Sequence, residues 1–215
     1  MDVKAQIDAV EREVEIREAD GATTYAQSLA QTYPSPLADV WDAVTSAERI
    51  PRWFLPVTGD LRLGGSYQLQ GNAGGEIRGC TPPADGRAEY TITWGMGGEP
   101  ALVTVRLTEV DPDHTRVEIH NVIAADALPL GMWEQYGPGA TGVGFELGMM
   151  GLGLHLTGDT SVTPETAEAW QVSDEGRDLT RRAVDAWADA QVASGASEQQ
   201  ARASADATYR FYTGT

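Results

Sequence analysis

The chain has few residues that could build a covalent or metal-held framework. Its 215 residues include one cysteine, Cys80, and three histidines. A single cysteine excludes an intrachain disulfide framework and a zinc site made of several cysteines. His114, His120 and His155 lack metal-ligand spacing, so we expect no metal, no catalytic residue set and no cofactor. We expect the lone thiol of Cys80 to be buried and inert.

Positive charge is also scarce. Lysine and arginine number 15 against 32 aspartates and glutamates, and the formal net charge is −17. Duplex nucleic acid and anionic membranes attract proteins through clustered basic charge, which this composition does not supply. We therefore expect no nucleic-acid partner.

Long hydrophobic runs are missing as well. The first 20 residues are polar and acidic, unlike the apolar core of a signal peptide. The longest apolar stretch, residues 141–156, contains Glu146 and is shorter than the roughly 20 residues that a membrane span needs. We expect a cytoplasmic protein with no membrane span. With 41% hydrophobic and 22% charged residues, the composition is typical of a globular domain.

The first 120 residues indicate an antiparallel sheet. Apolar residues alternate with charged ones in five runs separated by Gly, Pro, Asp or Asn: Leu61/Leu63, Tyr67/Leu69, Tyr90/Ile92/Trp94, Val103/Val105/Leu107 and Val117/Ile119. Strict alternation of apolar and charged residues predicts strands with one buried and one solvent-exposed face, as in a sheet with helices on one side. Asp20-Gly21 predicts a hairpin turn before these runs. Ser35-Pro36 predicts the start of a short helix.

After Gly139 the pattern becomes helical. Large apolar residues fall on two stripes of this predicted helix, and between them runs a strip of Gly144, Gly148, Gly151 and His155, which we call the glycine strip. Each helix-interior glycine costs about 1 kcal/mol relative to alanine, so the strip indicates close backbone approach or space left for a guest. Glu146 falls opposite the strip, and we expect it to face solvent. GPGATG at residues 137–142 is interpreted as a glycine-rich start of this helix, because no βαβ pattern surrounds it.

The segment after Thr157 reads as helical. Ser173 and Ser197 are predicted N-caps of two helices that carry alanine-rich stripes. Such stripes bury little area in isolation, so we expect the segment to pack on the rest of the protein or on a second subunit. The predicted organisation is a domain of residues 1–157 and a helical C-terminal extension of residues 158–215.

Several stretches resemble one known family. SPLADVWDAVTSAERIPRWFLP, GDLRLGGSYQL, GNAGGEIRGCTPP, the TITW strand and the TRVEIHN strand are similar to successive blocks of the C-terminal domain of the heat-shock-protein-90 ATPase activator, within the START-related (SRPBCC) superfamily. The stretch from Gly137 to Leu156 and a tail containing FYTG resemble a bacterial subgroup of this family. The chain departs from many relatives at Phe145, where they carry Trp, and at Asn121, where they carry His.

The resemblance implies an α+β helix-grip fold, in which an antiparallel sheet wraps around a long C-terminal helix and leaves an apolar cavity between them. We expect aromatic side chains and the glycine strip to enclose a pocket of roughly 300 Å³ or more. Aromatic side chains offer a large apolar surface to a ligand, and a side-chain amide that points inward can orient the ligand through hydrogen bonds. The candidate ligand-binding residues are Trp53, Phe54, Tyr67, Trp94, Asn121, Trp133, Phe145 and Met149.

The function predicted from these observations is non-covalent binding of a hydrophobic or amphipathic small molecule. The superfamily also includes enzymes, so a cyclase or dehydratase using the same cavity is the first alternative. An enzyme needs a polar group in the cavity, for which Asn121, His155 and Tyr67 are the candidates. Cochaperone-like stimulation of a heat-shock ATPase is the third hypothesis. A homodimer is left open.

Overall fold

Alternating strands form one eight-stranded antiparallel sheet. The computed structural model describes residues 2–97 and 99–215. The strand order is β1-β2-β8-β7-β6-β5-β4-β3. The strands are β1 (Glu11–Ala19), β2 (Ala22–Tyr33), β3 (Val57–Gly59), β4 (Ser66–Leu69), β5 (Gly74–Ala84), β6 (Arg87–Trp94), β7 (Ala101–Asp111) and β8 (His114–Ala124). Asp20 and Gly21 form the predicted hairpin turn with positive φ angles of 53° and 80°.

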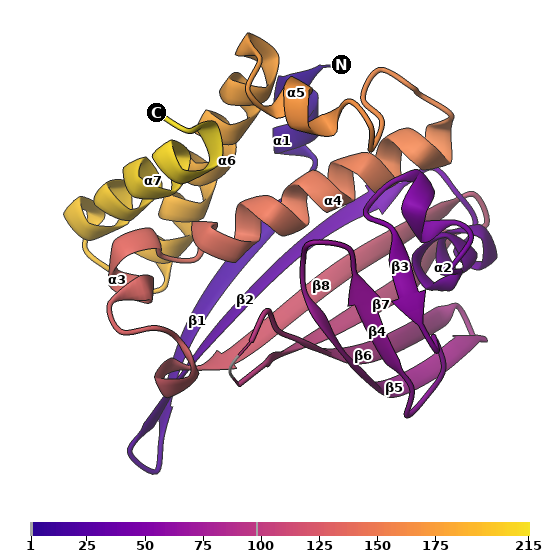
Figure 1. The fold of residues 1–215 in the computed structure, drawn as a ribbon, viewed down its shortest axis with the longest axis horizontal. Helices are drawn as coiled ribbons and strands as arrows, with labels where there is room; N and C mark the ends of the chain where they lie inside the picture. Colours follow the sequence, from indigo (N-terminus) through magenta and orange to yellow (C-terminus); the bar gives the residue numbers. More distant parts are fainter. Residues whose placement is uncertain (1, 98) are drawn as a thin grey trace.

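The predicted long helix is α4 (Gly139–Thr157), which crosses the concave face of the sheet. Figure 1 shows the curved sheet on one side of α4 and a second layer of helices on the other. Both chain ends lie in that helical layer. This arrangement confirms the predicted α+β helix-grip fold, with the sheet wrapped around α4.

Short helical segments complete the wall beside α4. They are α2 (Leu37–Thr45) and the 3₁₀ turn η1 (Ile50–Arg52), which follow β2. Pro36 rather than Ser35 occupies the N-cap position of α2, and the Ser35 hydroxyl instead bonds the Asp39 carboxylate at 2.7 Å. A second pair, η2 (Ala125–Ala127) and α3 (Met132–Tyr136), connects β8 to α4.

The remaining helices are α1 (Val3–Asp8), α5 (Ala167–Gln171), α6 (Asp174–Ala193) and α7 (Glu198–Thr213). Ser173 and Ser197 cap α6 and α7 as predicted, accepting hydrogen bonds from the backbone N–H groups of Gly176 and Gln200. The hydroxyl of Tyr212 donates to the Ala140 carbonyl at 2.9 Å, which joins α7 to the start of α4.

One continuous core includes side chains from before and after Thr157. Ala183, Val184 and Trp187 of α6 belong to the same buried cluster as Leu29 of the sheet and Val143 of α4. Trp187 is only 1% exposed. The division into residues 1–157 and 158–215 stays a proposal, because the two parts share this core.

The glycine-rich stretch before α4 fits against this helical layer. Gly137 has a φ of 58°, and a side chain there would lie 2.8 Å from Gln191 Oε1. At Gly142 a β-carbon would lie 2.7 Å from Trp187 Nε1. Glycine at these two positions allows the close approach of α6, a structural use that explains the stretch without a nucleotide.

Candidate functional site

An apolar cavity of about 170 Å³ lies between the sheet, α4 and the α2–η1 segment. Its roof is α4, which contributes Phe145, Gly148, Met149 and Leu152. The floor is formed by inward residues of the alternating strands: Tyr67, Leu69, Ile77, Tyr90, Ile92, Trp94, Val103, Val105, Val117 and Ile119. The cavity lies where the fold predicts it, but it is smaller than the expected volume of roughly 300 Å³, and Gly148 is the one member of the glycine strip that lines it. Large side chains on both the floor and the roof fill much of the space.

Two aromatic pairs close opposite parts of the cavity wall. Trp94 at the end of β6 lies against Phe145 of α4, with ring centroids 5.3 Å apart. Trp53 and Phe54, which follow η1, stack with centroids 5.5 Å apart and planes at 24°. The Trp53 indole donates to the Ala43 carbonyl at 2.9 Å, which fixes that ring to α2. Trp53 therefore presents an aromatic face to the cavity while its indole N–H is directed elsewhere.

Two tyrosines bring hydroxyl groups to the sheet side. The Tyr67 hydroxyl donates to the Thr93 carbonyl at 2.8 Å. Burial raises the pKa of Tyr67 and of Tyr90 above the ordinary value, so both phenols stay protonated at neutral pH. Neither is suited to act as a base, and the Tyr67 proton is already engaged.

Six of the eight predicted ligand-binding residues lie together on the cavity wall. They are Trp53, Phe54, Tyr67, Trp94, Phe145 and Met149. Sequence reasoning did not single out the strand residues between them, such as Ile92 and Val105, although their inward alternation was visible.

The other two predicted residues, Asn121 and Trp133, lie outside the cavity. Asn121 is 5% exposed on β8, one inward step beyond Ile119. Its cross-strand neighbour Gln27 hydrogen-bonds Thr141 in the first turn of α4, so α4 closes over this part of the sheet. Trp133 of α3 instead stacks on Tyr25 of β2, with centroids 3.9 Å apart and planes at 3°. Placing these two at the cavity was wrong, because β8 extends past the cavity end at Asn121 and α3 directs Trp133 onto Tyr25 of β2.

Cys80 is exposed and borders the cavity, contrary to the expected buried thiol. It lies on β5, whose register with β6 shifts on either side of it. β4 pairs only with the first residues of β5, Gly74–Glu76, so Cys80 lies beyond the part of β5 that β4 covers. Cys80 thus marks a place where solvent reaches the cavity wall.

Glu146 is buried at 2% exposure, which contradicts the solvent-facing prediction. Its carboxylate forms an ion pair with Arg12 of β1, whose side chain is 7% exposed, and accepts a hydrogen bond from the Trp187 indole at 3.0 Å. The reason is α6, which covers the face of α4 opposite the glycine strip. With both partners fixed away from the cavity, Glu146 has a structural role.

His155, the polar member of the glycine strip, lies near the end of α4 and beside Arg49. The guanidinium Nη2 atom is 3.2 Å from His155 Nε2. Burial, reinforced by the nearby positive charges of Arg49 and Arg52, lowers the pKa of His155. The His155 ring does not line the apolar cavity, so it is not positioned to react with a molecule bound there.

No group of three or more His, Cys, Asp or Glu side chains in residues 2–97 and 99–215 could hold a metal ion. Within the same residues, every helix is too short or too polar to cross a membrane.

Comparisons with known proteins identify relatives of the whole chain. Residues 34–148 match the family described as "Activator of Hsp90 ATPase homolog 1-like protein". The crystal structure of CalU16 from Micromonospora echinospora is 31% identical, with a TM-score of 0.60 over 85% of this chain and 98% of CalU16. Its solution structure is 30% identical, with a TM-score of 0.66 over 87% and 97%.

A more distant structure supports the fold alone. A conserved protein of unknown function from Enterococcus faecalis is 11% identical, with a TM-score of 0.53 over 84% of this chain and 91% of that protein. No curated protein matches the sequence. From the matched residues, the helix-grip architecture and the similarity to CalU16, the chain belongs to the family of proteins similar to the activator of Hsp90 ATPase, within the SRPBCC superfamily.

Proposed function

We propose that this protein binds a hydrophobic or amphipathic small molecule, with an apolar part of that molecule in the cavity beneath α4. The observation that carries the proposal is the composition of the wall, which consists almost entirely of aliphatic and aromatic side chains from the sheet, α2 and α4. Ligand sites are concave and mostly apolar in this way. A dry cavity of about 150 Å³ accepts a benzene-sized group. The apolar cavity beneath α4, which we call the inner cavity, therefore suits one ring or a short branched chain.

The positions of the candidate polar groups favour ligand binding over catalysis. Of the three candidates for an enzyme, Asn121 and His155 lie away from the cavity, and the Tyr67 hydroxyl is bonded to a backbone carbonyl. General acid–base catalysis needs a titratable group within hydrogen-bond reach of the substrate. We therefore propose a carrier or sensor that leaves its ligand unchanged.

Cochaperone activity rests on the family description alone. Stimulation of an Hsp90 ATPase should be measured in parallel with ligand binding. Stimulation that survives blockage of the cavity would favour this function over ligand binding. We also propose a cytoplasmic location, because the exposed thiol of Cys80 fits a reducing compartment.

Three responses of the protein, one of them the reactivity of Cys80, test ligand binding. Protein purified without denaturation is examined by native mass spectrometry for a bound small molecule, and then titrated with an apolar compound library. We expect ligands to change tryptophan emission, raise the melting temperature and slow the reaction of Cys80 with a thiol reagent. A library that leaves all three unchanged would overturn the proposal.

Two matched tryptophan substitutions test whether the ligand binds in the cavity. Met149→Trp should fill the cavity and abolish these responses, because Met149 is buried in the roof. Leu102→Trp adds the same side chain at an exposed position of β7 and should leave binding intact. Calorimetry measures affinity in both, and the melting curve verifies that each variant is folded.

A further inference from the structure

A second hollow, which we call the outer groove, runs along the other side of the glycine strip. It measures about 400 Å³ and is bordered by the residues after η1, by Gly144, Gly148 and Gly151 of α4, and by α5. Its lining mixes aromatic rings, such as Trp170, with polar groups, such as Asn72 and Gln171. The strip predicted from the sequence thus borders the outer groove, and at Gly151 it also meets backbone, because a β-carbon there would clash with the Trp53 carbonyl oxygen.

The outer groove and the inner cavity share Trp53, Phe54 and Gly148. A β-carbon added at Gly148 would lie 3.4 Å from the Phe54 ring, so this ring faces the bare backbone of α4. Trp53 is fixed through its indole N–H, whereas the Phe54 side chain has no polar anchor. The Phe54 ring is therefore part of the partition between the two spaces, and passage of a ligand between them requires this ring to move.

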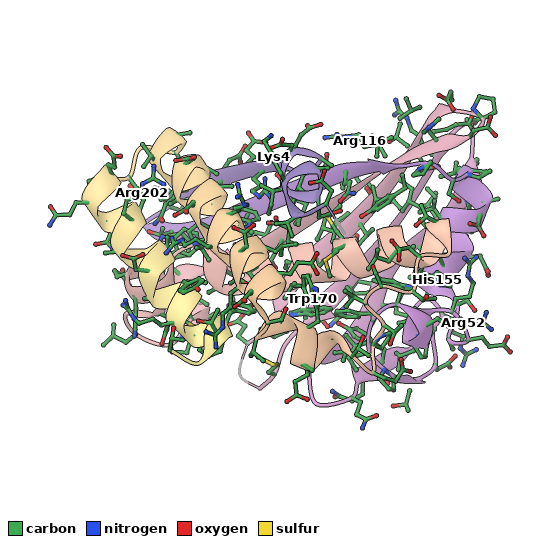
Figure 2. The ribbon with its side chains drawn as sticks, turned by 90° about the horizontal axis from the view of Figure 1, so that it is seen from above. Lys4, Arg52, Arg116, His155, Trp170 and Arg202 are labelled. Carbon is green, nitrogen blue, oxygen red and sulfur yellow. The ribbon has the colours of Figure 1, made fainter. Side chains whose placement is uncertain are left out.

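The two spaces differ in polarity. The inner cavity is apolar, while one end of the outer groove carries Arg52 and His155. Arg52 is exposed and forms no ion pair within the described residues, in a chain of net charge −17. Figure 2 shows His155 and Arg52 near one another and Trp170 farther along the molecule, with Lys4, Arg116 and Arg202 elsewhere.

His155 adds a donor to this end of the groove. The Arg49 guanidinium can only donate, so His155 Nε2 accepts its hydrogen bond and the neutral ring carries its proton on Nδ1. One carboxylate, that of Asp159, also lines the groove, where its oxygen accepts from the Ser161 N–H at 2.8 Å. The Arg52 end therefore offers unused donors to a negatively charged oxygen.

We propose that the outer groove binds the carboxylate end of an anionic amphiphile, whose apolar end passes Phe54 into the inner cavity. This inference rests on the proposed function, since it needs the inner cavity to accept an apolar group. Charge complementarity at Arg52 selects the carboxylate. The small volume of the inner cavity explains why a longer ligand would need both spaces.

The test compares headgroups on one apolar chain. Decanoate, 1-decanol and decyltrimethylammonium are titrated into the full-length protein by calorimetry at low salt, the two ions below their micellar concentrations and the alcohol below its solubility limit. We expect decanoate to bind at least about threefold more tightly than the alcohol, a gain typical of an exposed ion pair, and the cation to bind most weakly. Arg52→Gln should remove the preference for decanoate.

Arg87→Gln is the matched control, since Arg87 is also exposed and lacks an ion pair in the described part of the chain but lies on β6, outside both spaces. It should keep the full preference. Equal affinity for acid and alcohol, or a preference unchanged by Arg52→Gln, would overturn the inference while leaving the proposed function standing. If none of the three compounds binds while ring compounds of the apolar library do, the inference is overturned and the proposed function stands; the proposed function fails only if that library also leaves the protein unchanged.

The length of the ligand's alkyl chain tests whether the ligand passes from the outer groove into the inner cavity. Affinity for carboxylates from hexanoate to decanoate should rise with each added methylene as the tail enters the inner cavity. Gly148→Leu places a side chain against Phe54 and should abolish that rise while hexanoate still binds. A rise that persists in a folded Gly148→Leu protein would contradict passage at Phe54.

Discussion

The two sides of α4 use the same residue type for opposite purposes. On the side facing α6, Gly142 is glycine because the Trp187 ring occupies the position that a β-carbon would take. On the side facing the outer groove, Gly148 meets only the Phe54 ring at ordinary contact distance. The side facing α6 is filled and its buried charge is paired, whereas the other side borders the outer groove around Gly148 and is closed by the Trp53 carbonyl at Gly151. Glycine in a helix therefore indicates either contact or space, and only the neighbouring residues decide which.

The largest expected effect concerns the helical layer as a whole. A chain ending after Gly158 loses the buried side chains of Leu179, Val184 and Trp187, each of which contributes about 1.5–3 kcal/mol. We expect the free energy of unfolding to fall by about 5 kcal/mol or more. Calorimetry and hydrogen exchange of the two chains measure it. Unchanged melting and oligomeric state, with unprotected amides in α6 and α7 of the full chain, would mean that this layer does not stabilise the fold.

Next in size is the ion pair beneath α6. Glu146→Ala leaves the Arg12 guanidinium buried without its partner, and we expect a loss of about 3–5 kcal/mol in the free energy of unfolding. The matched control is Glu11→Ala, which removes the partner of Arg116 at the surface and should cost about 1 kcal/mol or less. Urea denaturation compares the two. Similar losses would show that burial does not strengthen the Glu146 contact.

The two glycines themselves give the third prediction. Gly142→Ala forces the Trp187 ring or α4 to move and should lower the free energy of unfolding by about 1–3 kcal/mol. Gly148→Ala meets no such obstacle and should raise it by up to about 1 kcal/mol, because alanine favours the helix. Equal changes in denaturation midpoint would remove the distinction between the two sides of α4.

The smallest expected effect is a pH dependence at the groove end. His155 has a lowered pKa because of burial and the charges of Arg49 and Arg52, and Asp39 has a lowered pKa chiefly because Arg49 donates to it. Both groups bind protons more weakly in the folded chain than in the unfolded one. Their stabilisation is therefore complete above the unfolded pKa, about 6.5 for histidine, and is lost as the pH falls.

We expect the free energy of unfolding to decrease as the pH falls from about 7 to about 5, and His155→Gln to flatten that decrease. Asp39 titrates at lower pH and leaves this window largely unaffected. Urea titrations of both proteins across the window provide the measurement. An identical slope in the variant would show that His155 is not the titrating group.

Local patterns predicted the sheet, the long helix and most of the cavity wall. Alternation along β6 to β8 fixed which side chains point inward, and the resemblance then placed Trp53, Phe54 and Phe145 around the same space. Asn121 shares that inward phase, but periodicity does not reveal how far along a strand a cavity extends. Glu146 was misplaced because its surroundings depend on α6, which begins 28 residues later in the sequence. The outer groove depends on loops whose positions no periodic pattern encodes.

Arg12 has a further consequence for how β1 pairs. This strand is the edge of the sheet, where a slip by one residue would send every side chain to the opposite face. The slip would place Glu11 or Glu13 in the position of Arg12, opposite the Glu146 carboxylate. Like charges would then meet in a buried site, so the Arg12–Glu146 pair selects one alignment of β1 among its neighbours. An inward charge also makes an edge strand a poor template for a second chain.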